Sequence, residues 1–164
     1  MIIASVLVIV SVAVDQLTKF LIFGNAPVSI IGNVLWFQST LNTGVAFGMF
    51  ENSNLLFLII SSVACVIFVY LLFSKKFFVS RTQKVCIGLI LGGTLSNLID
   101  RIAFGGVRDF IYLKFINFAI FNIADMCVTI SVIVFCAYLL FHTIKKDDSE
   151  KSKETEVKGE KWLN

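Results

Sequence analysis

Four long apolar runs constrain the fold of this chain more than any other feature of its sequence. They cover approximately Ile2 to Phe23, Asn54 to Phe73, Val85 to Phe104 and Phe118 to Phe141. A helix of about 20 residues crosses a hydrocarbon core of about 30 Å, so each run is long enough to span a bilayer. Lipid offers backbone N–H and C=O groups no partners, so a spanning segment must satisfy them internally. The runs predict an all-α integral membrane protein with four transmembrane helices.

The composition agrees with this fold class, because 57% of residues are hydrophobic, far more than a soluble domain of 164 residues needs. We expect one membrane domain at residues 1–146, followed by a polar cytoplasmic tail at residues 147–164 that is disordered. The first run is not expected to be a cleavable signal peptide. It lacks a basic start, and Asp15 and Lys19 interrupt it.

The basic residues of the connections predict the orientation in the membrane. The connection 74–84 carries four Lys and Arg residues, whereas the longer connection 24–53 carries none. By the positive-inside rule, the first is cytoplasmic, the second is extracytoplasmic, and both termini lie in the cytoplasm. Of the 14 Lys and Arg residues, these four and six more from Lys145 onward lie in segments expected to be cytoplasmic, so the net charge of +3 does not indicate a nucleic-acid partner.

The extracytoplasmic connection between the first two runs has the pattern of short strands. Its β-prone pieces are separated by turn signals at Gly32-Asn33 and Asn42-Thr43-Gly44. These pieces are Val28 with Ile30 and Ile31, Val34 to Phe37, and Val45 to Phe47. We expect a small extracytoplasmic β-ribbon, or cradle, between the first and second helices at the outer membrane surface.

Polar residues within the runs gather at one depth of the membrane. At about 1.5 Å of rise per residue, Asp15, Asp100 and Asp125 each lie about 20 Å from the inner side. Asp109, on the outer connection, lies near the same level. The first, third and fourth helices therefore predict one polar chamber that opens outward, whereas the second helix serves packing. The chamber residues are Asp15, Lys19, Asn97, Asp100, Arg101, Asn122 and Asp125.

For two sets of these residues, we favour a structural role over a catalytic role. Asp15 and Lys19 are spaced i, i+4 and can form an ion pair, with Lys19 snorkelling outward; anchoring of a substrate by Lys19 is the alternative. The segment from Gly92 to Arg101 combines small residues, which let membrane helices approach closely, with polar groups that supply hydrogen bonds.

Asp109 and Asp125 favour a catalytic interpretation. Ionisable groups at membrane depth are costly and mark functional sites. Two adjacent carboxylates that cannot both ionise easily give one protonated and one charged member near neutral pH. A general acid and a general base need this arrangement to activate water against a peptide carbonyl. The two residues therefore predict hydrolysis of a peptide bond.

Other chemistries have weaker support in the sequence. The single histidine, His142, lies at the cytoplasmic end of the fourth run, and the cysteines show no metal or disulfide spacing. We expect no metal, no cofactor and no disulfide. Two rival functions are a proton-coupled transporter and a non-enzymatic membrane scaffold. Against a transporter, all intramembrane charges lie toward one leaflet and no inverted repeat is evident.

The sequence resembles the lipoprotein signal peptidases, also called signal peptidase II, which are bacterial membrane aspartyl proteases. The resemblance covers essentially the whole chain except the polar tail. It depends on five stretches in order: Asp15-Gln16-Leu17-Thr18-Lys19, Asn42-Thr43-Gly44-Val45-Ala46-Phe47, Gly93 through Asn97 to Asp100-Arg101, Val107-Arg108-Asp109-Phe110, and Phe121-Asn122-Ile123-Ala124-Asp125.

The resemblance implies an aspartic endopeptidase in the bacterial cytoplasmic membrane, with Asp109 and Asp125 as its catalytic dyad on the extracytoplasmic side. The implied substrate is a prolipoprotein cut N-terminal to a cysteine that carries diacylglycerol, and globomycin is an implied inhibitor. The implied supporting residues are Asp15, Lys19, Asn42, Gly44, Asn97, Asp100, Arg101 and Asn122. Membrane lipid is an expected partner, and a monomer suffices for one self-contained site.

Arg108 departs from the pattern, because an apolar or small residue is more usual there. Its guanidinium, next to Asp109 in sequence, is expected either to alter the proton affinity of that carboxylate or to bind a lipid headgroup. The sequence leaves open which aspartate begins as the acid.

Overall fold

The computed structural model describes residues 2–44, 53–74, 80–116 and 118–160, with side chains as far as Lys145. The predicted strand piece Val45 to Phe47 lies outside these residues. The helices are α1 (Ile2–Ile22), α2 (Asn54–Phe73), α3 (Arg81–Phe104) and α4 (Ile123–Glu160). The strands are β1 (Val28–Ile31), β2 (Leu35–Asn42) and β3 (Val107–Leu113), and the 3₁₀ turn η2 (Lys114–Ile116) follows β3. Four helices of this part of the chain are long and apolar enough to span a membrane, as predicted.

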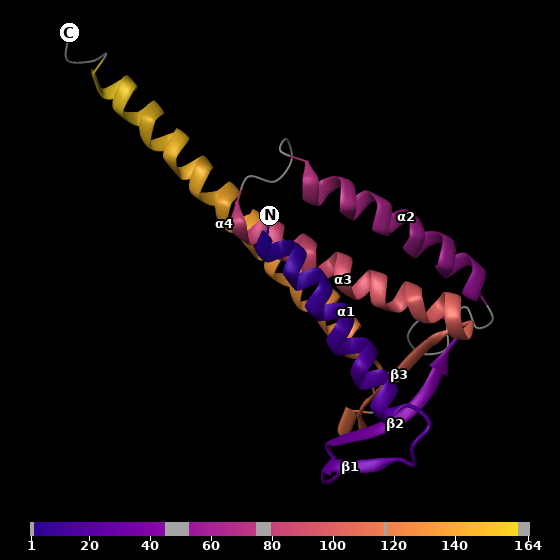
Figure 1. The fold of residues 1–164 in the computed structure, drawn as a ribbon. Coiled ribbons are helices and arrows are strands. Elements are labelled where there is room, and N and C mark those ends of the chain that lie inside the picture. Colours follow the sequence, from indigo (N-terminus) through magenta and orange to yellow (C-terminus); the bar gives the residue numbers. More distant parts are fainter. Residues whose placement is uncertain (1, 45–52, 75–79, 117, 161–164) are drawn as a thin grey trace.

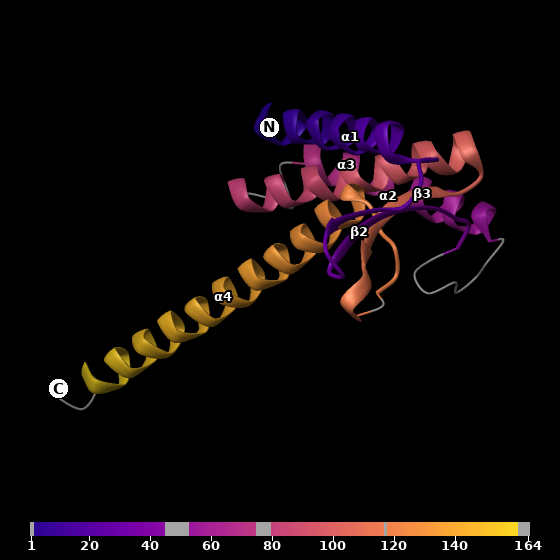
Figure 2. The ribbon, with the colours of Figure 1, turned by 90° about the horizontal axis from the view of Figure 1, so that it is seen from below.

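Helix α3 is the centre of the bundle, because it contacts α1, α2 and α4. Figure 1 shows α1 and α2 on different sides of α3, with the sheet beyond the ends of α1 and α3. The start of α1, the end of α2 and the start of α3 lie together at the opposite end. Turned by 90°, α4 is seen to leave the other helices and to extend past them (Figure 2).

Two adjacent glycines of α3 explain its close contacts with two different helices. A Cβ on Gly92 would lie 3.1 Å from the carbonyl oxygen of Val8 in α1. A Cβ on Gly93 would lie 2.5 Å from the carbonyl oxygen of Ala124 in α4. A residue larger than glycine would not fit at either position without moving α1 or α4, which agrees with the close-packing interpretation of this segment.

Helix α3 begins at Arg81, four residues before the predicted start at Val85. Ser80 is the N-cap: its Oγ accepts a hydrogen bond from the Gln83 N–H at 3.1 Å, and its own N–H donates to Gln83 Oε1 at 3.2 Å. This capping box satisfies two of the free N–H groups of the first turn, which polar composition alone did not indicate.

Helix α4 begins at Ile123, so the prediction of helix from Phe118 onward was wrong. Phe121 instead extends the sheet: its N–H donates to the Ile111 carbonyl at 3.0 Å, and its carbonyl accepts from the Ile111 N–H at 2.8 Å. Asp125 therefore lies in the first turn of α4 and not seven residues inside the helix.

The end of α4 also differs from the prediction. The backbone continues as one helix to Glu160, whereas a disordered tail was expected from Asp147. The tail is rich in Lys and Glu, which have high helix propensity, so a polar composition does not by itself prevent a helix. The division of the chain into two parts at residue 146 stays a prediction.

The predicted ribbon is part of a three-stranded antiparallel sheet in the order β1-β2-β3. Two of the three expected pieces form β1 and β2 after α1, but the third strand of the sheet, β3, comes from the connection between α3 and α4, which the sequence did not indicate. In the register of β2 and β3, Thr40 faces Asp109 and Asn42 faces Val107. Asp109 is therefore held on a paired strand and not on a free loop.

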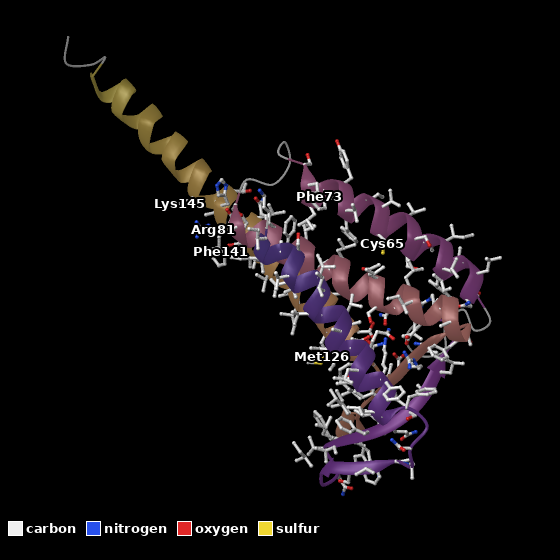
Figure 3. The ribbon with its side chains drawn as sticks, viewed as in Figure 1. Cys65, Phe73, Arg81, Met126, Phe141 and Lys145 are labelled. Carbon is white, nitrogen blue, oxygen red and sulfur yellow. The ribbon has the colours of Figure 1, made fainter. Side chains whose placement is uncertain are left out.

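The outside of the bundle is apolar, as lipid contact requires. The most exposed large apolar residues include Ile2 at 80%, Phe20 at 77% and Phe141 at 74%. In Figure 3, white carbon side chains project along the helices, and red and blue atoms gather where α1, α3 and β3 meet. Met126 lies toward the sheet end, whereas Phe141 and Lys145 lie toward the other (Figure 3). The polar interior is thus confined to one end of the bundle.

Candidate active site

Strand β3 delivers Asp109 to this polar interior. Val107 and Phe110 are buried in the same strand, and the Asp109 side chain is only 2% exposed. Its Oδ2 accepts a hydrogen bond from Asn42 Nδ2 at 3.0 Å, and its Oδ1 accepts one from Asn122 Nδ2 at 2.6 Å. The carboxyl group of Asp109 is therefore held by two neutral amides.

Asp125 is placed by the start of α4. Asn122 is the residue before the helix: its Oδ1 accepts from the Asp125 N–H at 2.9 Å, and its N–H donates to Asp125 Oδ2 at 3.2 Å. This reciprocal pair is a capping box with Asp as the third helical residue. Asn97 of α3 donates from Nδ2 to the other oxygen, Oδ1, at 2.7 Å. The first turn of a helix also favours negative charge.

Asn122 connects the two aspartates directly, because it donates to Asp109 and caps the turn of Asp125. The pairing of Phe121 with Ile111 explains how this happens, since it returns the chain alongside β3 just before α4 begins. Both carboxylates border the same cavity of about 590 Å³. Residues sixteen apart in sequence are thus brought to one space.

The surroundings of Asp109 favour its protonated form. Burial and, second to it, the charge of Asp125 raise the pKa of Asp109 to about 7, while hydrogen bonds from Asn42 and Asn122 and the charge of Lys19 oppose the rise. A carboxyl group with this pKa carries a proton for much of the time near neutral pH. The pair can therefore offer both an acid and a base.

A second group of charges lies behind the pair. Lys19 Nζ donates to Asp15 Oδ2 at 2.7 Å, to Asp100 Oδ2 at 3.1 Å and to Asn97 Oδ1 at 2.9 Å. These contacts use all three donors of the ammonium group. The predicted ion pair of Asp15 and Lys19 is confirmed, but the expectation that Lys19 snorkels outward was wrong, because its side chain is fully buried.

Asp15 also holds the start of α4. Its Oδ1 accepts the Ala124 N–H at 2.9 Å, and its Oδ2 accepts the Ser96 hydroxyl at 2.7 Å. The Ala124 N–H is one of the first-turn groups that have no partner within the helix. Asp15 thus ties α1, α3 and α4 together at the level of Asp125.

Arg101 reaches the cavity from the end of α3. Its Nη2 donates to the Gly44 carbonyl at 3.3 Å, its guanidinium lies 5.6 Å from the Phe57 ring centre, and its Nε has no partner among the described groups. The Gly44 N–H in turn donates to Asn42 Oδ1 at 3.1 Å. The cavity is therefore bordered by an arginine, by amides and by both aspartates.

The remaining wall of the cavity is apolar. It is formed mainly by the segment between β3 and α4 and by the first turns of α4. The apolar residues include Leu113, Ile116, Phe118, Ile120, Phe121, Met126 and Ile130. A ligand in this space would meet carboxylates at one side and hydrocarbon at the other.

Comparisons with known proteins identify the family of this chain. The family model described as signal peptidase (SPase) II matches residues 7–141. The chain belongs to the signal peptidase II family. It is therefore a bacterial multi-pass membrane protein of a peptidase family, and the family resemblance predicted from its motifs is confirmed.

Individual relatives of this signal peptidase II family cover most of the chain. A lipoprotein signal peptidase of Clostridioides difficile is 34% identical over 143 residues, covering 85% of this chain and 95% of the relative. A lipoprotein signal peptidase of Lactobacillus johnsonii is 38% identical over 143 residues, covering 85% and 90%. A bacterial membrane enzyme solved by the in meso method at 2.3 Å matches with a TM-score of 0.79 and 33% identity, covering 87% of this chain and 90% of that one.

All ten residues that the sequence singled out lie around the cavity or in the charged group behind it. Sequence reasoning missed Gln16 and Ser96, which connect these residues. Gln16 Nε2 donates to Asp100 Oδ1 at 2.9 Å and to the Ser96 carbonyl at 3.0 Å. The available signal was a polar amide inside an apolar run. Among the described residues, no group of three or more His, Cys, Asp or Glu is placed to hold a metal ion.

The hypothesis about Arg108 was wrong on both of its alternatives. Arg108 is 7% exposed, so it does not reach a headgroup, and its side chain bonds to Asp100 and Gln16 instead of Asp109. Consecutive residues of a strand point to opposite faces, which separates the two side chains despite their adjacency in sequence.

Proposed function

We propose that this protein is an aspartic endopeptidase that removes the signal peptide from diacylglyceryl-modified prolipoproteins, with Asp109 and Asp125 as its dyad. The observation that carries the proposal is that both carboxylates border one cavity and are joined through Asn122. Membership of the signal peptidase II family supports cleavage of prolipoprotein signal peptides. The dyad and the cleavage site are our additions.

The reaction requires one shared proton. The ionised member of the dyad takes a proton from a water molecule, and the resulting hydroxide attacks the scissile carbonyl carbon. The protonated member donates to the carbonyl oxygen as the tetrahedral intermediate forms, and proton transfer to the amide nitrogen then releases the new amine. The pKa of Asp109, about 7, supports such sharing near neutral pH. Because the two groups are coupled, the proton belongs to the pair.

The cavity suits a peptide that carries lipid. A signal peptide in the bilayer is helical, so its backbone must be unwound where it is cut, and the freed groups need hydrogen bonds. Asn42, Asn97 and Arg101 supply polar groups at the cavity. We propose that the acyl chains of the modified cysteine lie along the apolar wall that includes Ile116 and Ile130. Cleavage then falls on the N-terminal side of that cysteine.

The orientation follows from the same proposal. The cavity lies at the sheet end of the bundle, whereas the end of α2 at Phe73 and the start of α3 at Arg81, which flank the basic connection in the sequence, lie at the other end (Figure 1). With the basic connection in the cytoplasm, the dyad faces the extracytoplasmic side and both termini are cytoplasmic. One chain supplies every residue of the proposed dyad and its supports, so we propose that a monomer is active.

The test is cleavage of a purified prolipoprotein with a diacylglyceryl cysteine, followed by mass spectrometry. We expect a product that begins at the lipidated cysteine and no cleavage of a Cys→Ser precursor that cannot carry lipid. Asp109→Asn and Asp125→Asn should each lower turnover by about a thousandfold or more, since each removes one proton-transfer group. Both variants should keep the binding of globomycin.

The matched control is Asp148→Asn, which makes the same change in the polar tail. It should cleave at the rate of the unchanged protein. Turnover in either dyad variant within about tenfold of that control would remove the dyad from the proposal, because a general acid or base contributes about a hundredfold or more. A product that begins at another residue would remove the proposed cleavage site.

A further inference from the structure

The carboxylate of Asp100 is the most heavily bonded group behind the proposed dyad. Its Oδ2 accepts the backbone N–H of Arg108 at 2.9 Å and Lys19 Nζ at 3.1 Å. Its Oδ1 accepts Arg108 Nη2 at 2.8 Å and Nε at 3.3 Å, together with Gln16 Nε2 at 2.9 Å. Asp100 is fully buried in α3. One side chain therefore binds α1 and β3 to the last turns of α3.

Gln16 closes a triangle with Asp100 and Arg108. Its Oε1 accepts Arg108 Nη2 at 2.7 Å while its Nε2 donates to Asp100. The guanidinium also lies 4.2 Å from the Phe104 ring centre, which fixes its plane. Planar, fork-shaped donors of this kind are specific to arginine, since a lysine ammonium is a single point of charge.

The triangle holds the strand at the residue directly before Asp109. Arg108 contributes both its backbone N–H and its side chain, so the position of β3 relative to α3 is fixed there. The same Asp100 carboxylate reaches Asp125 by a second route, through Lys19 and then Asn97. Asp100 is thus connected to both members of the proposed dyad: to Asp109 through the neighbouring Arg108, and to Asp125 through Lys19 and Asn97.

We propose that Arg108 and Gln16 are positioning residues for the peptidase reaction: by bracing β3 on Asp100, they set the distance from Asp109 to Asp125. This inference rests on the proposed dyad. Neither residue borders the cavity, so neither is placed to touch the substrate. The brace acts through the geometry of Asp109, whose own hydrogen bonds come from Asn42 and Asn122.

The principal test replaces Arg108 with methionine, which keeps the length and the backbone N–H but removes the guanidinium. We expect kcat for the lipid-modified precursor to fall about 10- to 100-fold, because a misplacement of about 1 Å costs that much. KM should change by less than about threefold, since the cavity wall is untouched. A kcat within twofold of the unchanged protein in a folded Arg108→Met variant would overturn the proposal.

The matched control is Lys114→Met, which also removes one cation close to β3. Lys114 is exposed, lies over the Trp36 ring at 4.1 Å, and has no ion pair among the described residues. Its kcat and KM should stay at the values of the unchanged protein. If both variants lose kcat equally, the effect comes from charge in general, and the brace is rejected.

A double-mutant cycle tests the partnership of Gln16 and Arg108. Gln16→Met alone should lower kcat by less than Arg108→Met, because Arg108 retains its bonds to Asp100. The double variant should lose less than the product of the two single effects, since both act on one contact network. If the loss of kcat in the double variant equals the product of the losses in the two single variants, Gln16 does not act through Arg108.

The conservative variant Arg108→Lys covers the case in which Arg108→Met does not fold. It keeps a cation beside Asp100 but cannot serve Asp100 and Gln16 as one planar fork. We expect normal thermal stability and a kcat between those of Arg108→Met and the unchanged protein. Unchanged kcat in Arg108→Lys, with Arg108→Met unfolded, would overturn the proposal by leaving the residue a stabilising role only.

The pH profile of kcat separates positioning from simple loss of stability. The charged groups that act on Asp109 are Asp125 of α4 and Lys19 of α1, and Arg101 of α3 interacts with both aspartates. If β3 moves away from Asp125, the alkaline limb of the kcat profile should shift to lower pH in Arg108→Met and not in Lys114→Met.

Asp109→Asn distinguishes the proposal about the brace from the proposal about the dyad. If it is inactive while Arg108→Met is fully active, only the brace fails; if it is active, the dyad itself fails.

Discussion

Two pairs of aspartates share the polar interior of this protein, and their partners differ. Asp15 and Asp100 are bonded to cations, Lys19 and Arg108, so two negative and two positive charges cancel. Asp109 and Asp125 are bonded to amides and backbone N–H groups, and neither forms an ion pair with a residue that the structure describes. Asp15 and Asp100 do not line the cavity, whereas Asp109 and Asp125 do.

The difference shows how one polar interior can serve both structure and chemistry. Buried charges that are fully paired and hydrogen-bonded are inert, but removal of one partner is costly. Carboxylates that are hydrogen-bonded only to neutral donors lack a compensating cation, so protonation of one of them lowers their electrostatic repulsion. We infer that changes in the first pair lower stability as well as turnover, because the same contacts hold the helices and β3, and that changes in the second affect turnover first.

The largest expected effect is on stability, from Lys19→Met. This change leaves two buried carboxylates facing each other without the shared ammonium, which should cost about 3–5 kcal/mol. Thermal unfolding in detergent should show a strongly lowered midpoint and a low yield of folded protein. Asp109→Asn should instead keep or raise the midpoint, since it removes a buried acid that has no cation partner. Equal loss of stability in both variants would contradict the distinction between the pairs.

The next effect is expected at Asn122, which is hydrogen-bonded to both Asp109 and Asp125. Asn122→Ala removes the N-cap of α4 and the donor to Asp109, so stability should fall by about 1–2 kcal/mol. Turnover should fall more than in Asn42→Ala, which removes a donor from Asp109 alone. Single-turnover assays measure the comparison, with thermal unfolding in detergent as the folding control. A larger loss in Asn42→Ala would show that the link between the aspartates is unimportant.

The positions of the buried charged residues could be predicted from the sequence more accurately than the helices and strands in which they lie. Depth along each run placed Asp15, Asp100 and Asp125 at one level, and the i, i+4 spacing identified the ion pair with Lys19. These inferences depend on the rise of a helix and on the cost of charge in lipid, both of which are local properties.

Long-range pairing could not be predicted in the same way. The third strand and the bridge of Phe121 to Ile111 join segments whose own sequences resemble loop or helix. The start of α4 at Ile123 follows from that bridge, because the chain is extended until Asn122 caps the helix. The direction of the Arg108 side chain depends on β3 being a strand, so the error about its partners had the same origin.

A smaller effect is expected from pH, and it concerns only the amide-held pair. Burial and the charge of Asp125 raise the pKa of Asp109 from 3.8 to about 7, so between these pH values the folded state keeps a proton that the unfolded state has lost. The stability from this group is fully present below about pH 4 and is lost as pH rises through about 7. Asp109→Asn should flatten that part of the curve of unfolding midpoint against pH. An unchanged slope in the variant would assign the pH dependence to other groups.

The smallest expected effect, and the last, is from reagents that attack neither pair. The proposed reaction uses a water molecule and two carboxyl groups, and none of the four cysteines borders the cavity. A chelator such as EDTA or a thiol-blocking maleimide should therefore change turnover by less than about twofold, whereas a general acid or base contributes about a hundredfold or more. A metallopeptidase and a cysteine peptidase treated in parallel verify that each reagent is active. Strong inhibition by either reagent would mean that the amide-held aspartates do not carry the chemistry alone, and it would remove the functional contrast between the two pairs.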